Sequence, residues 1–391
     1  MRLTQDFERV RDVVKRTDPS FARVDRAALK AQLEDVKARA AEGAREPFLL
    51  SAMRLLALAG NGHTRLIPND AISVLPVRFV AVGASVVLTR TAVQRAPPVL
   101  SKLIAVNGMD VAEIERAAAP FLAGTPQRRR VIGPILLAWP AALAHLGAVS
   151  TGDVTQYRLK DAGGAETTLE LRHDETVPAT ELYPRNEHGR SCPGWSPRAF
   201  AEIHERGAAG VVIDLPSFFD PERRALPDAI GNAAAWIRAH SERPLVLDVR
   251  GNSGGDFLLT MPLIDAVVES AGHSGVVVLV DKFTFSAAIV FVAILKHRLG
   301  KKLTIVGEEM GDGLRFYAEG DTLDLPASGA AVRYSSALHD WETGTVDETT
   351  PADIARVIVP VGRLEIASLE SDRWKHLAFD WESRAGAVSP G

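Results

Sequence analysis

The stretch that most constrains the fold is residues 245–287. An apolar run at 245–249 ends in a glycine-rich turn, RGNSGG, at 250–255. An amphipathic run and a second apolar run at 276–280 follow, and the chain then turns into a third apolar run that begins at Ser286. This order of strand, turn, helix, strand, turn and helix is typical of a parallel α/β sheet. Parallel strands end at the same edge of a sheet, so both turns are expected there.

The rest of the chain divides into segments of different character. Residues 1–69 are expected to be a helical segment that ends in the turn carrying His63. Residues 70–175 contain short β-rich runs separated by glycine turns and are expected to form a middle domain. Residues 176–391 are expected to be an α/β core. The proline-broken polar stretch at 173–198 is expected to mark its boundary, or to form a lid over the site. Within the core, further strands are expected at 211–215 and 303–306, and helices at about 199–206, 225–239, 257–270 and 287–298.

The amino-acid composition is that of a globular protein and argues against several kinds of partner and site. The 391 residues are 46% hydrophobic and 24% charged, which is ordinary for a globular chain. A net charge of −4 gives no sign of a nucleic-acid partner. Cys192 is the single cysteine, which excludes internal disulfides and a cysteine metal cluster. The start lacks an apolar signal core and no apolar run is long enough for a membrane span, so the chain as given is expected to be cytoplasmic unless a leader was trimmed.

The sequence allows two interpretations of Ser286. Serine is a favoured N-cap, so it could simply begin the helix that follows. A helix N-terminus also offers free N–H groups and the positive end of a dipole, which suit a serine nucleophile and a developing oxyanion. Gly254 and Gly255 are either a tight turn or, with the Ala287 N–H, the donors of an oxyanion hole. His63, on a glycine-flanked turn, is either structural or the base that a serine hydroxyl needs.

A rival nucleophile lies in the first turn. Residues 251–255 match G-x-S-x-G between a strand and a helix, which would make Ser253 the nucleophile of an α/β-hydrolase-type esterase. Such an enzyme needs a histidine downstream, and His297, His339 and His376 are available. The sequence carries no metal-binding or dinucleotide motif, so no metal and no cofactor are expected.

Four motifs in order resemble the C-terminal-processing, or tail-specific, serine peptidases, including the tricorn core peptidases. They are GNGHT at 60–64, DVRGNSGG at 248–255, TFSAA at 284–288 and the segment 306–313. The resemblance implies a crotonase-like (ClpP-like) core with Ser286 as nucleophile. It also implies that the β-rich middle domain is PDZ-like.

The same resemblance separates two ways of activating the serine. One branch of the family uses a lysine in a G-K-G turn, which here reads Gly-Asp-Gly at 311–313 and excludes that scheme. The tricorn-like branch uses the histidine of the H-T turn, which is His63, and an acid for which the resemblance implies Glu342. Asn61 and Gly62 depart from the family pattern, and acidic residues in the 308–313 loop would repel a substrate carboxylate.

The sequence therefore predicts a serine hydrolase, most simply a peptidase with a peptide or protein substrate. Two alternatives stay open. The chain could be a non-catalytic ligand- or peptide-binding protein on the same scaffold, or the Ser253 esterase. The sequence leaves open whether the chain forms a homo-oligomer.

Overall fold

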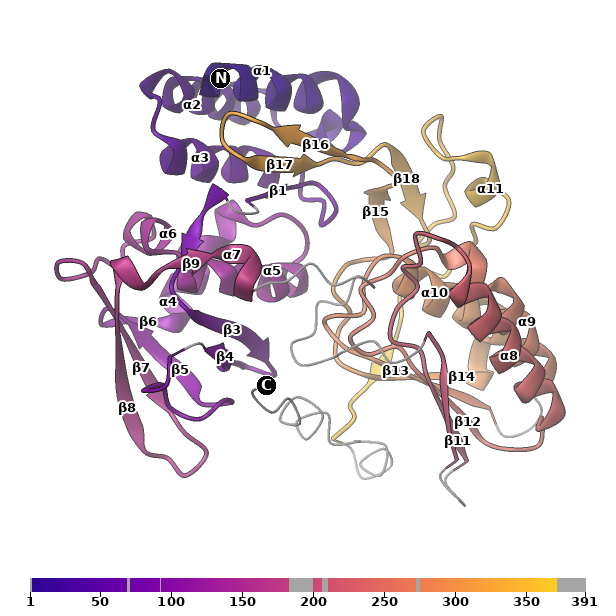
Figure 1. Ribbon diagram of the computed structural model, residues 1–391. Coiled ribbons are helices and arrows are strands. Elements are labelled where there is room, and N and C mark those ends of the chain that lie inside the picture. Colours follow the sequence, from indigo (N-terminus) through magenta and orange to yellow (C-terminus); the bar gives the residue numbers. More distant parts are fainter. Residues whose placement is uncertain are drawn as a thin grey trace. The chain divides into compact units, whose positions relative to one another are not determined.

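The computed structural model in Figure 1 describes residues 2–68, 71–91, 93–182, 200–205, 210–271 and 275–370. The chain forms two compact units. The first comprises Met1–Arg185 and Tyr317–Ala337, and the second comprises Asn186–Phe316 and Leu338–Gly391. The segments predicted at 1–69 and 70–175 both lie in the first unit, together with a part of the segment predicted as the α/β core. The stretch at 183–199, with most of the predicted boundary loop and Cys192, lies outside the described residues.

The first unit begins with helices. These are α1 (Leu3–Asp12), α2 (Arg26–Glu42) and α3 (Arg45–Ala57), with a π-turn at Val13–Thr17 and a 3-10 turn at Pro19–Arg23. Asp25 caps α2, because its carboxylate accepts a hydrogen bond from the Ala28 N–H at 2.8 Å. The buried Asp6 of α1 accepts hydrogen bonds from the backbone N–H groups of Ala327 and Ser328, which ties the returning segment Tyr317–Ala337 to this helix.

A three-stranded antiparallel sheet joins the two parts of the first unit. Its order is β1 (Arg65–Ile67), β17 (Ala330–Arg333) and β16 (Thr322–Leu325). Strand β1 follows the turn that carries His63, and Figure 1 shows β16 and β17 lying beside the N-terminal helices. The sheet therefore fixes the start of β1, and with it the histidine turn, against a distant part of the chain.

The β-rich part of the first unit is a second antiparallel sheet. Its strands, in spatial order, are β3 (Val77–Val82), β4 (Ser85–Thr91), β5 (Lys102–Val106), β7 (Val154–Lys160) and β8 (Glu166–Arg172), with β6 (Met109–Asp110) paired to β5. Strands β2 (Ser73–Val74) and β9 (Val177–Pro178) form a separate pair. The remaining helices are α4 (Val111–Ala118), α5 (Pro126–Ile132), α6 (Pro140–His145) and α7 (Ala179–Leu182), and 3-10 turns lie at Ala119–Phe121, Gly133–Ala138 and His173–Glu175.

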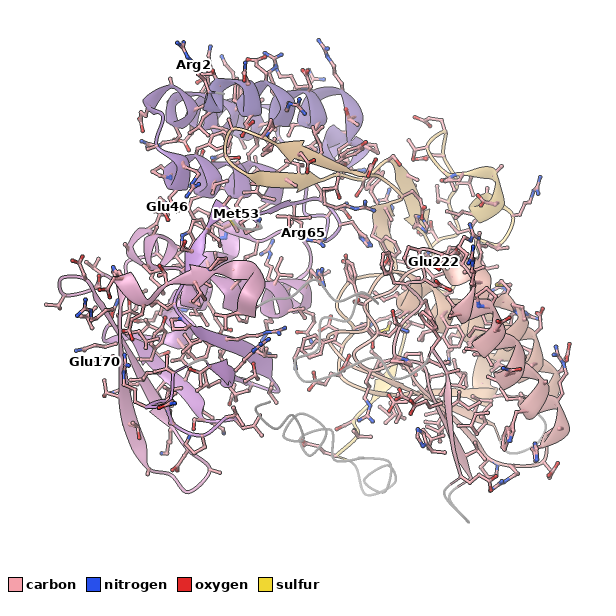
Figure 2. All side chains as sticks on the ribbon, in the orientation of Figure 1. Arg2, Glu46, Met53, Arg65, Glu170 and Glu222 are labelled. Carbon is pink, nitrogen blue, oxygen red and sulfur yellow. The ribbon has the colours of Figure 1, made fainter. Side chains whose placement is uncertain are left out.

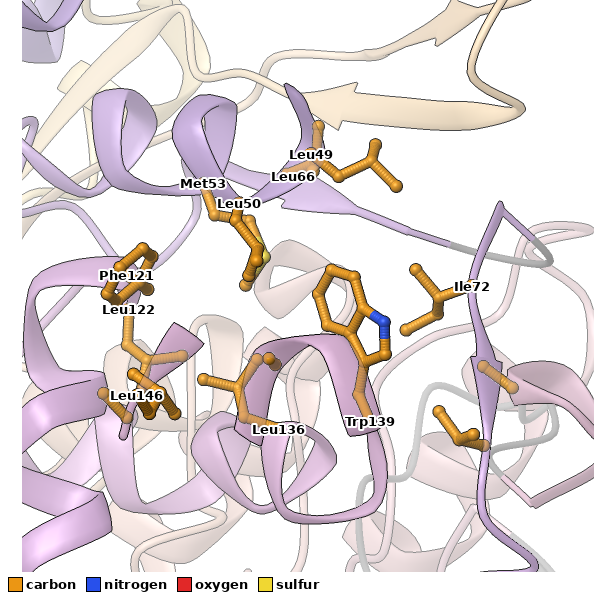
Figure 3. Close-up of a cluster of buried hydrophobic side chains, with 14 of the residues drawn as sticks. Leu49, Leu50, Met53, Leu66, Ile72, Phe121, Leu122, Leu136, Trp139 and Leu146 are labelled. Atoms are coloured by element: carbon orange, nitrogen blue, oxygen red, sulfur yellow. The ribbon is translucent and has the colours of Figure 1, made fainter. Parts of the chain in front are cut away.

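The core of the first unit lies between the helices and both sheets. Figure 3 shows Leu50, Met53, Leu136 and Trp139 meeting there, and the Trp139 side chain is 1% exposed. Its indole N–H donates to the Glu46 carboxylate at 3.2 Å, so the one polar atom of this side chain is satisfied.

The second unit is built on a six-stranded sheet. The order is β10 (Glu202–Glu205), β11 (Val211–Asp214), β12 (Leu245–Asp248), β13 (Val276–Val280), β14 (Leu303–Gly307) and β19 (Ile366–Ala367). All of these pairs are parallel except β10 with β11. The helices are α8 (Ala225–Ala239), α9 (Met261–Ser270), α10 (Ala287–Leu299) and α11 (Ala352–Ala355), with 3-10 turns at Phe257–Thr260 and Gly300–Lys302. The parallel sheet predicted from the alternation of strands and helices is thus present.

Helix α10 is apolar on every side. Its residues 287–295 are all buried, and it contacts α9 and the strand β14. A helix that is hydrophobic all round belongs in a core rather than on a surface. Because Ser286 precedes this helix directly, its backbone is attached to one of the most rigid parts of the unit.

One prediction about a helix is wrong. Residues 202–205 form the strand β10 rather than a helix, because pairing with β11 satisfies the backbone of a segment too short to be stable as a helix alone. In the first unit, α5, a 3-10 turn and α6 follow one another without forming a single helix. Pro134 and Pro140 lack the N–H that a continuous helix needs.

The chain passes between the units within a pair of strands, β15 (Arg315–Ala318) and β18 (Ala337–Asp340). None of the helices in the described ranges is both long enough and apolar enough to cross a membrane.

Candidate functional site: the Ser286 turn

Ser286 has a backbone conformation that few residues other than glycine adopt. Its φ is 56° and its ψ is −125°. Such angles cost a non-glycine residue on the order of 1–3 kcal/mol, and they cluster where a side chain must be held in a functional position. The same sharp strand-to-helix turn presents the serine in the nucleophile elbow of other hydrolases.

The Ser286 side chain does not cap the helix that it begins. Its hydroxyl makes no hydrogen bond to the first turn of α10, so N-capping does not explain a serine at this position. The side chain is half-buried, whereas its neighbours Phe285 and Ala287 are buried. The hydroxyl is therefore presented on a rigid turn without a local structural role.

Asp281 builds the turn that leads to the serine. One oxygen of its carboxylate accepts hydrogen bonds from the N–H groups of Phe283 and Thr284 at 2.9 and 3.0 Å. The same oxygen accepts the Gly251 N–H at 3.0 Å, which joins this turn to the first glycine-rich turn. Burial raises the pKa of the Asp281 carboxyl, and the hydrogen bond from Gly251 opposes that shift. The sequence analysis did not single out Asp281, although an Asp three residues before a Thr is a common turn signal.

Two further hydrogen bonds join the turns. The Thr284 hydroxyl donates to the Val249 carbonyl at 3.0 Å, and the Phe285 N–H donates to the Asn252 carbonyl at 3.0 Å. The strands β12 and β13 are parallel neighbours, so both turns leave the same edge of the sheet, as the sequence predicts. The glycine-rich turn is thereby held beside Ser286.

Gly254 touches the serine directly. A β-carbon at position 254 would lie 2.7 Å from the Ser286 Cβ and 2.9 Å from the Phe285 carbonyl oxygen. Its φ of +103° also favours glycine. The Gly254 N–H donates to the Asn252 side-chain oxygen at 2.9 Å, so this amide is already engaged within the turn.

Two other amides near the serine are placed differently. The Ala287 N–H is the first of helix α10, and within the described part of the chain it has no hydrogen-bond acceptor. Gly255 lies opposite Phe218 in an isolated parallel β-bridge. The two hydrogen bonds of this bridge are made by the residues on either side of Gly255: the Phe218 N–H donates to the Gly254 carbonyl, and the Asp256 N–H donates to the Phe218 carbonyl. In a parallel bridge of this kind the N–H of Gly255 itself points away from Phe218. Ala287 therefore offers its N–H at the start of α10 beside the serine, and the Gly255 N–H is not used in the bridge to Phe218.

The loop that follows β14 also meets the nucleophile turn. The Gly311 N–H donates to the Thr284 carbonyl at 2.9 Å, and a β-carbon at Gly311 would lie 2.4 Å from the Lys282 carbonyl oxygen. Asp312 comes directly after this contact, where the lysine-dependent branch of the resembled family has its base. Lys282, buried before the serine, is paired through its ammonium with Glu308 at 3.1 Å.

His63 lies in the first unit on a turn that a buried polar network holds. Thr64 donates to the Asp18 carboxylate at 2.6 Å, and the Asn61 amide nitrogen donates to the Thr64 and Ser335 hydroxyls at 2.9 Å. The Ser335 N–H donates to the same Asp18 oxygen at 2.9 Å. His63 itself is 8% exposed. The histidine is therefore fixed from both sides by residues far apart in sequence.

Glu342 lies on a turn that follows β18, in the second unit. Its side chain is exposed, whereas the neighbouring Asp340 is buried and accepts a hydrogen bond from the Arg315 guanidinium at 3.0 Å. His63 belongs to the other unit. The role of Glu342 as the acid that orients His63 stays a prediction.

The rival site around Ser253 lacks the conformation that an elbow needs. In its turn the positive φ values fall on the glycines at 251, 254 and 255 and not on the serine. His339 is buried and stacks on Phe316 with ring centroids 5.1 Å apart, and His297 faces the Pro360 carbonyl. His376 lies outside the described residues. The elbow geometry is found at Ser286.

One group of side chains has the spacing of metal ligands. Atoms of Glu202, His204 and Asp214 lie within 4.8 Å of one another across β10 and β11. The sequence analysis predicts no metal and overlooked this group, because it took residues 202–205 for a helix. The strand pairing is what places Glu202 opposite Asp214.

Comparison with solved structures shows which proteins have a fold similar to that of this chain. No family model matches the chain, and no curated protein matches it. Among solved structures, mature CPAF is similar with a TM-score of 0.58 and 13% identity, over 94% of this chain and 92% of that one. The photosystem II D1 C-terminal processing protease matches with a TM-score of 0.40 and 17% identity, over 98% and 96%. The tricorn protease matches with a TM-score of 0.32 and 10% identity, over 85% of this chain and 32% of that one.

These three proteins are tail-specific or tricorn-like serine peptidases. The identities are low, so the comparison speaks for the fold and not for the substrate. The chain therefore shares the overall fold of mature CPAF.

Proposed function

We propose that the protein is a serine peptidase in which Ser286 is the nucleophile and His63 is the base. The observation that carries the proposal is the backbone of Ser286, which is held at φ 56° without capping its helix. Ser286 does not cap its helix and is held in an uncommon backbone conformation. A requirement that its hydroxyl face a substrate explains both observations. The fold shared with CPAF supports the same reading.

The proposed reaction follows from the groups around the turn. His63 takes the Ser286 proton as the serine oxygen attacks the carbonyl carbon of a peptide bond. The N–H groups of Ala287 and Gly255 stabilise the negative charge that develops on the carbonyl oxygen. The peptide nitrogen then leaves with the proton from His63, which gives an acyl-enzyme. Water attacks the ester while His63 accepts its proton, and the proton returns to Ser286 as the acid product leaves.

Several parts of the proposal extend the resemblance to the family. We assign the second unit a crotonase-like core and the β-rich part of the first unit a PDZ-like role in holding peptide. Glu342 is retained as the candidate that orients His63. Gly254 is assigned the close packing against Ser286, and Gly255 the hydrogen bond to the oxyanion.

The experiment is labelling by a fluorophosphonate, which reacts with an activated serine hydroxyl. The wild-type chain and the variants Ser286→Ala, Ser253→Ala and His63→Ala are compared by mass spectrometry. One adduct on Ser286, lost in Ser286→Ala, kept in Ser253→Ala and slowed in His63→Ala, is the expected result. Labelling that rises with pH through about 6.5, the ordinary pKa of histidine, identifies the base.

Two other results would favour a different function. An adduct on Ser253 favours the esterase reading. No adduct from about pH 6 to pH 9, a range that brackets the ordinary histidine pKa, favours a non-catalytic peptide-binding protein.

A further inference from the structure

Two arginines face each other across the sheet of the first unit. Arg65 of β1 is directly opposite Arg333 of β17 in an antiparallel pair. Residues in this position project to the same side, with Cβ atoms about 5 Å apart, and like charges placed so destabilise a sheet. Figure 2 labels Arg65, which follows His63 by two residues. The pair therefore lies at the edge of the histidine turn.

The side of the sheet is set by the neighbouring pair. Leu66 and Val332 are opposite each other and are 6% and 0% exposed, so they face the core. Side chains alternate along a strand, which places Arg65 and Arg333 on the other face. Both arginines are half-buried there.

Neither guanidinium forms an ion pair with a residue in the described ranges, where Arg65 donates a hydrogen bond to the Gly62 carbonyl at 3.2 Å. Burial and, to a smaller extent, the charge of Arg333 together lower the pKa of Arg65 to about 10. Two guanidiniums held opposite each other have the electrostatics of an anion-binding site.

We propose that Arg65 and Arg333 together bind a carboxylate group of the peptide substrate. The identity of the ligand as a peptide rests on the proposed function. A carboxylate between the two guanidiniums replaces one repulsion by two attractions, and the planar fork of arginine matches both carboxylate oxygens. The carboxylate comes either from the C-terminus of the peptide or from an Asp or Glu side chain.

The experiment measures peptide binding without cleavage. Ser286→Ala protein is titrated with fluorescein-labelled hexapeptide libraries, and binding is followed by anisotropy. One library has free C-termini and contains Asp and Glu, a second is amidated at the C-terminus, and a third has Asn and Gln in place of Asp and Glu. Loss of affinity in the second library alone identifies the C-terminal carboxylate, and loss in the third alone identifies an acidic side chain.

The arginines are tested in the same background. Arg65→Gln and Arg333→Gln are each expected to weaken binding of the preferred library about tenfold or more, as loss of a charged hydrogen-bonding partner implies. Arg26→Gln, an exposed arginine at the start of helix α2, is the matched control and should leave binding unchanged. Arg333→Gln is also expected to keep or raise the melting temperature, because it removes the repulsion.

The outcomes separate this proposal from the peptidase proposal. Fluorophosphonate labelling of the wild-type chain tests the peptidase proposal independently of the arginines. Carboxylate-dependent binding that is lost in both arginine variants upholds the arginine site even if no serine is labelled. Equal binding to all three libraries, no binding at about millimolar peptide, or a melting temperature that falls in Arg333→Gln with binding unchanged would show that the arginines are merely solvated or structural.

Discussion

Gly254 lies so close to Ser286 that a β-carbon at position 254 would be 2.7 Å from the serine Cβ. Backbone atoms stand on the other sides of the same spot, with the Phe285 carbonyl oxygen at 2.9 Å and the Ala287 nitrogen at 3.0 Å. Real β-carbons do not approach backbone so closely, so the Ser286 turn can take its shape only because residue 254 is glycine. This contact supplies the sharpest test of the turn.

Gly254→Ala is expected to displace the nucleophile turn. The added methyl group must push away the backbone of residues 285–287, and alanine is also strained at a φ of +103°. We expect a loss of about 2–4 kcal/mol in the free energy of unfolding, as for other overpacked and strained sites, together with loss of fluorophosphonate labelling. Urea denaturation and mass spectrometry measure the two effects.

The matched control for that change is Gly231→Ala. Gly231 lies in helix α8, is exposed and has nothing within 4 Å of an added β-carbon. Alanine is the better helix former there, so the variant should gain about 0.5–1 kcal/mol and keep its labelling. Equal stability and labelling in the two glycine variants would contradict the close packing of Gly254.

Ser286→Gly tests whether the serine is strained. Glycine adopts a φ of 56° without the steric cost that serine bears, although it also makes the unfolded chain more flexible. The net expectation is a gain of about 1 kcal/mol in the free energy of unfolding with all labelling lost. Ser286→Ala keeps the β-carbon and should not gain stability. If the glycine variant is less stable than the alanine variant, strain at Ser286 is not the explanation of its conformation.

Asp281→Asn tests the carboxyl that builds the turn, through pH. Burial raises the pKa of Asp281 above its ordinary value near 3.8, so its protonated form is favoured in the folded state. Its contribution to stability is therefore full below about pH 4 and is lost as pH rises through the raised pKa. Asparagine keeps an oxygen that can accept the N–H groups and does not ionise. The variant should accordingly gain stability relative to the wild type between about pH 4 and pH 7.

Urea denaturation at several pH values follows that difference. Asp228→Asn, at an exposed position in the first turn of α8, is the control and should show no such trend. A stability difference for Asp281→Asn that is constant with pH would mean that the carboxyl is not penalised by burial.

Asn61→Asp tests the network that holds the histidine turn. The Asn61 amide nitrogen donates to the Tyr317 carbonyl at 3.0 Å, and its oxygen accepts the Tyr317 N–H at 3.2 Å. A carboxylate can accept but cannot donate, and it would also face the buried Asp18 through their shared partner Thr64. We expect a loss of about 1–3 kcal/mol in the free energy of unfolding.

The same denaturation series includes Asn232→Asp, an exposed position on helix α8. This control should change stability by less than about 0.5 kcal/mol. A loss at position 61 no greater than at position 232 would show that the side-chain amide does not hold the turn.

The sequence by itself determined the parts that depend on local pattern. Apolar runs and glycine turns indicated the strands β11 to β14 and the helices between them, since burial of a parallel sheet leaves continuous apolar strands. The Asp25 cap of α2 is equally local, because the carboxylate accepts an N–H only three residues away. The two turns beside β12 and β13 could also be placed at one edge, because parallel strands leave no other arrangement.

Only the tertiary structure decided the contacts between distant residues. Whether Ser286 caps its helix or is held in a strained turn depends on Gly254 and Asn252, which approach it only after β12 and β13 have paired. The strand at 202–205 exists because β11 lies beside it. Arg65 and Arg333 face each other through a register that no periodicity records. Periodicity reports which side of an element is buried, whereas these contacts depend on which elements meet, and that is set by packing of the whole chain.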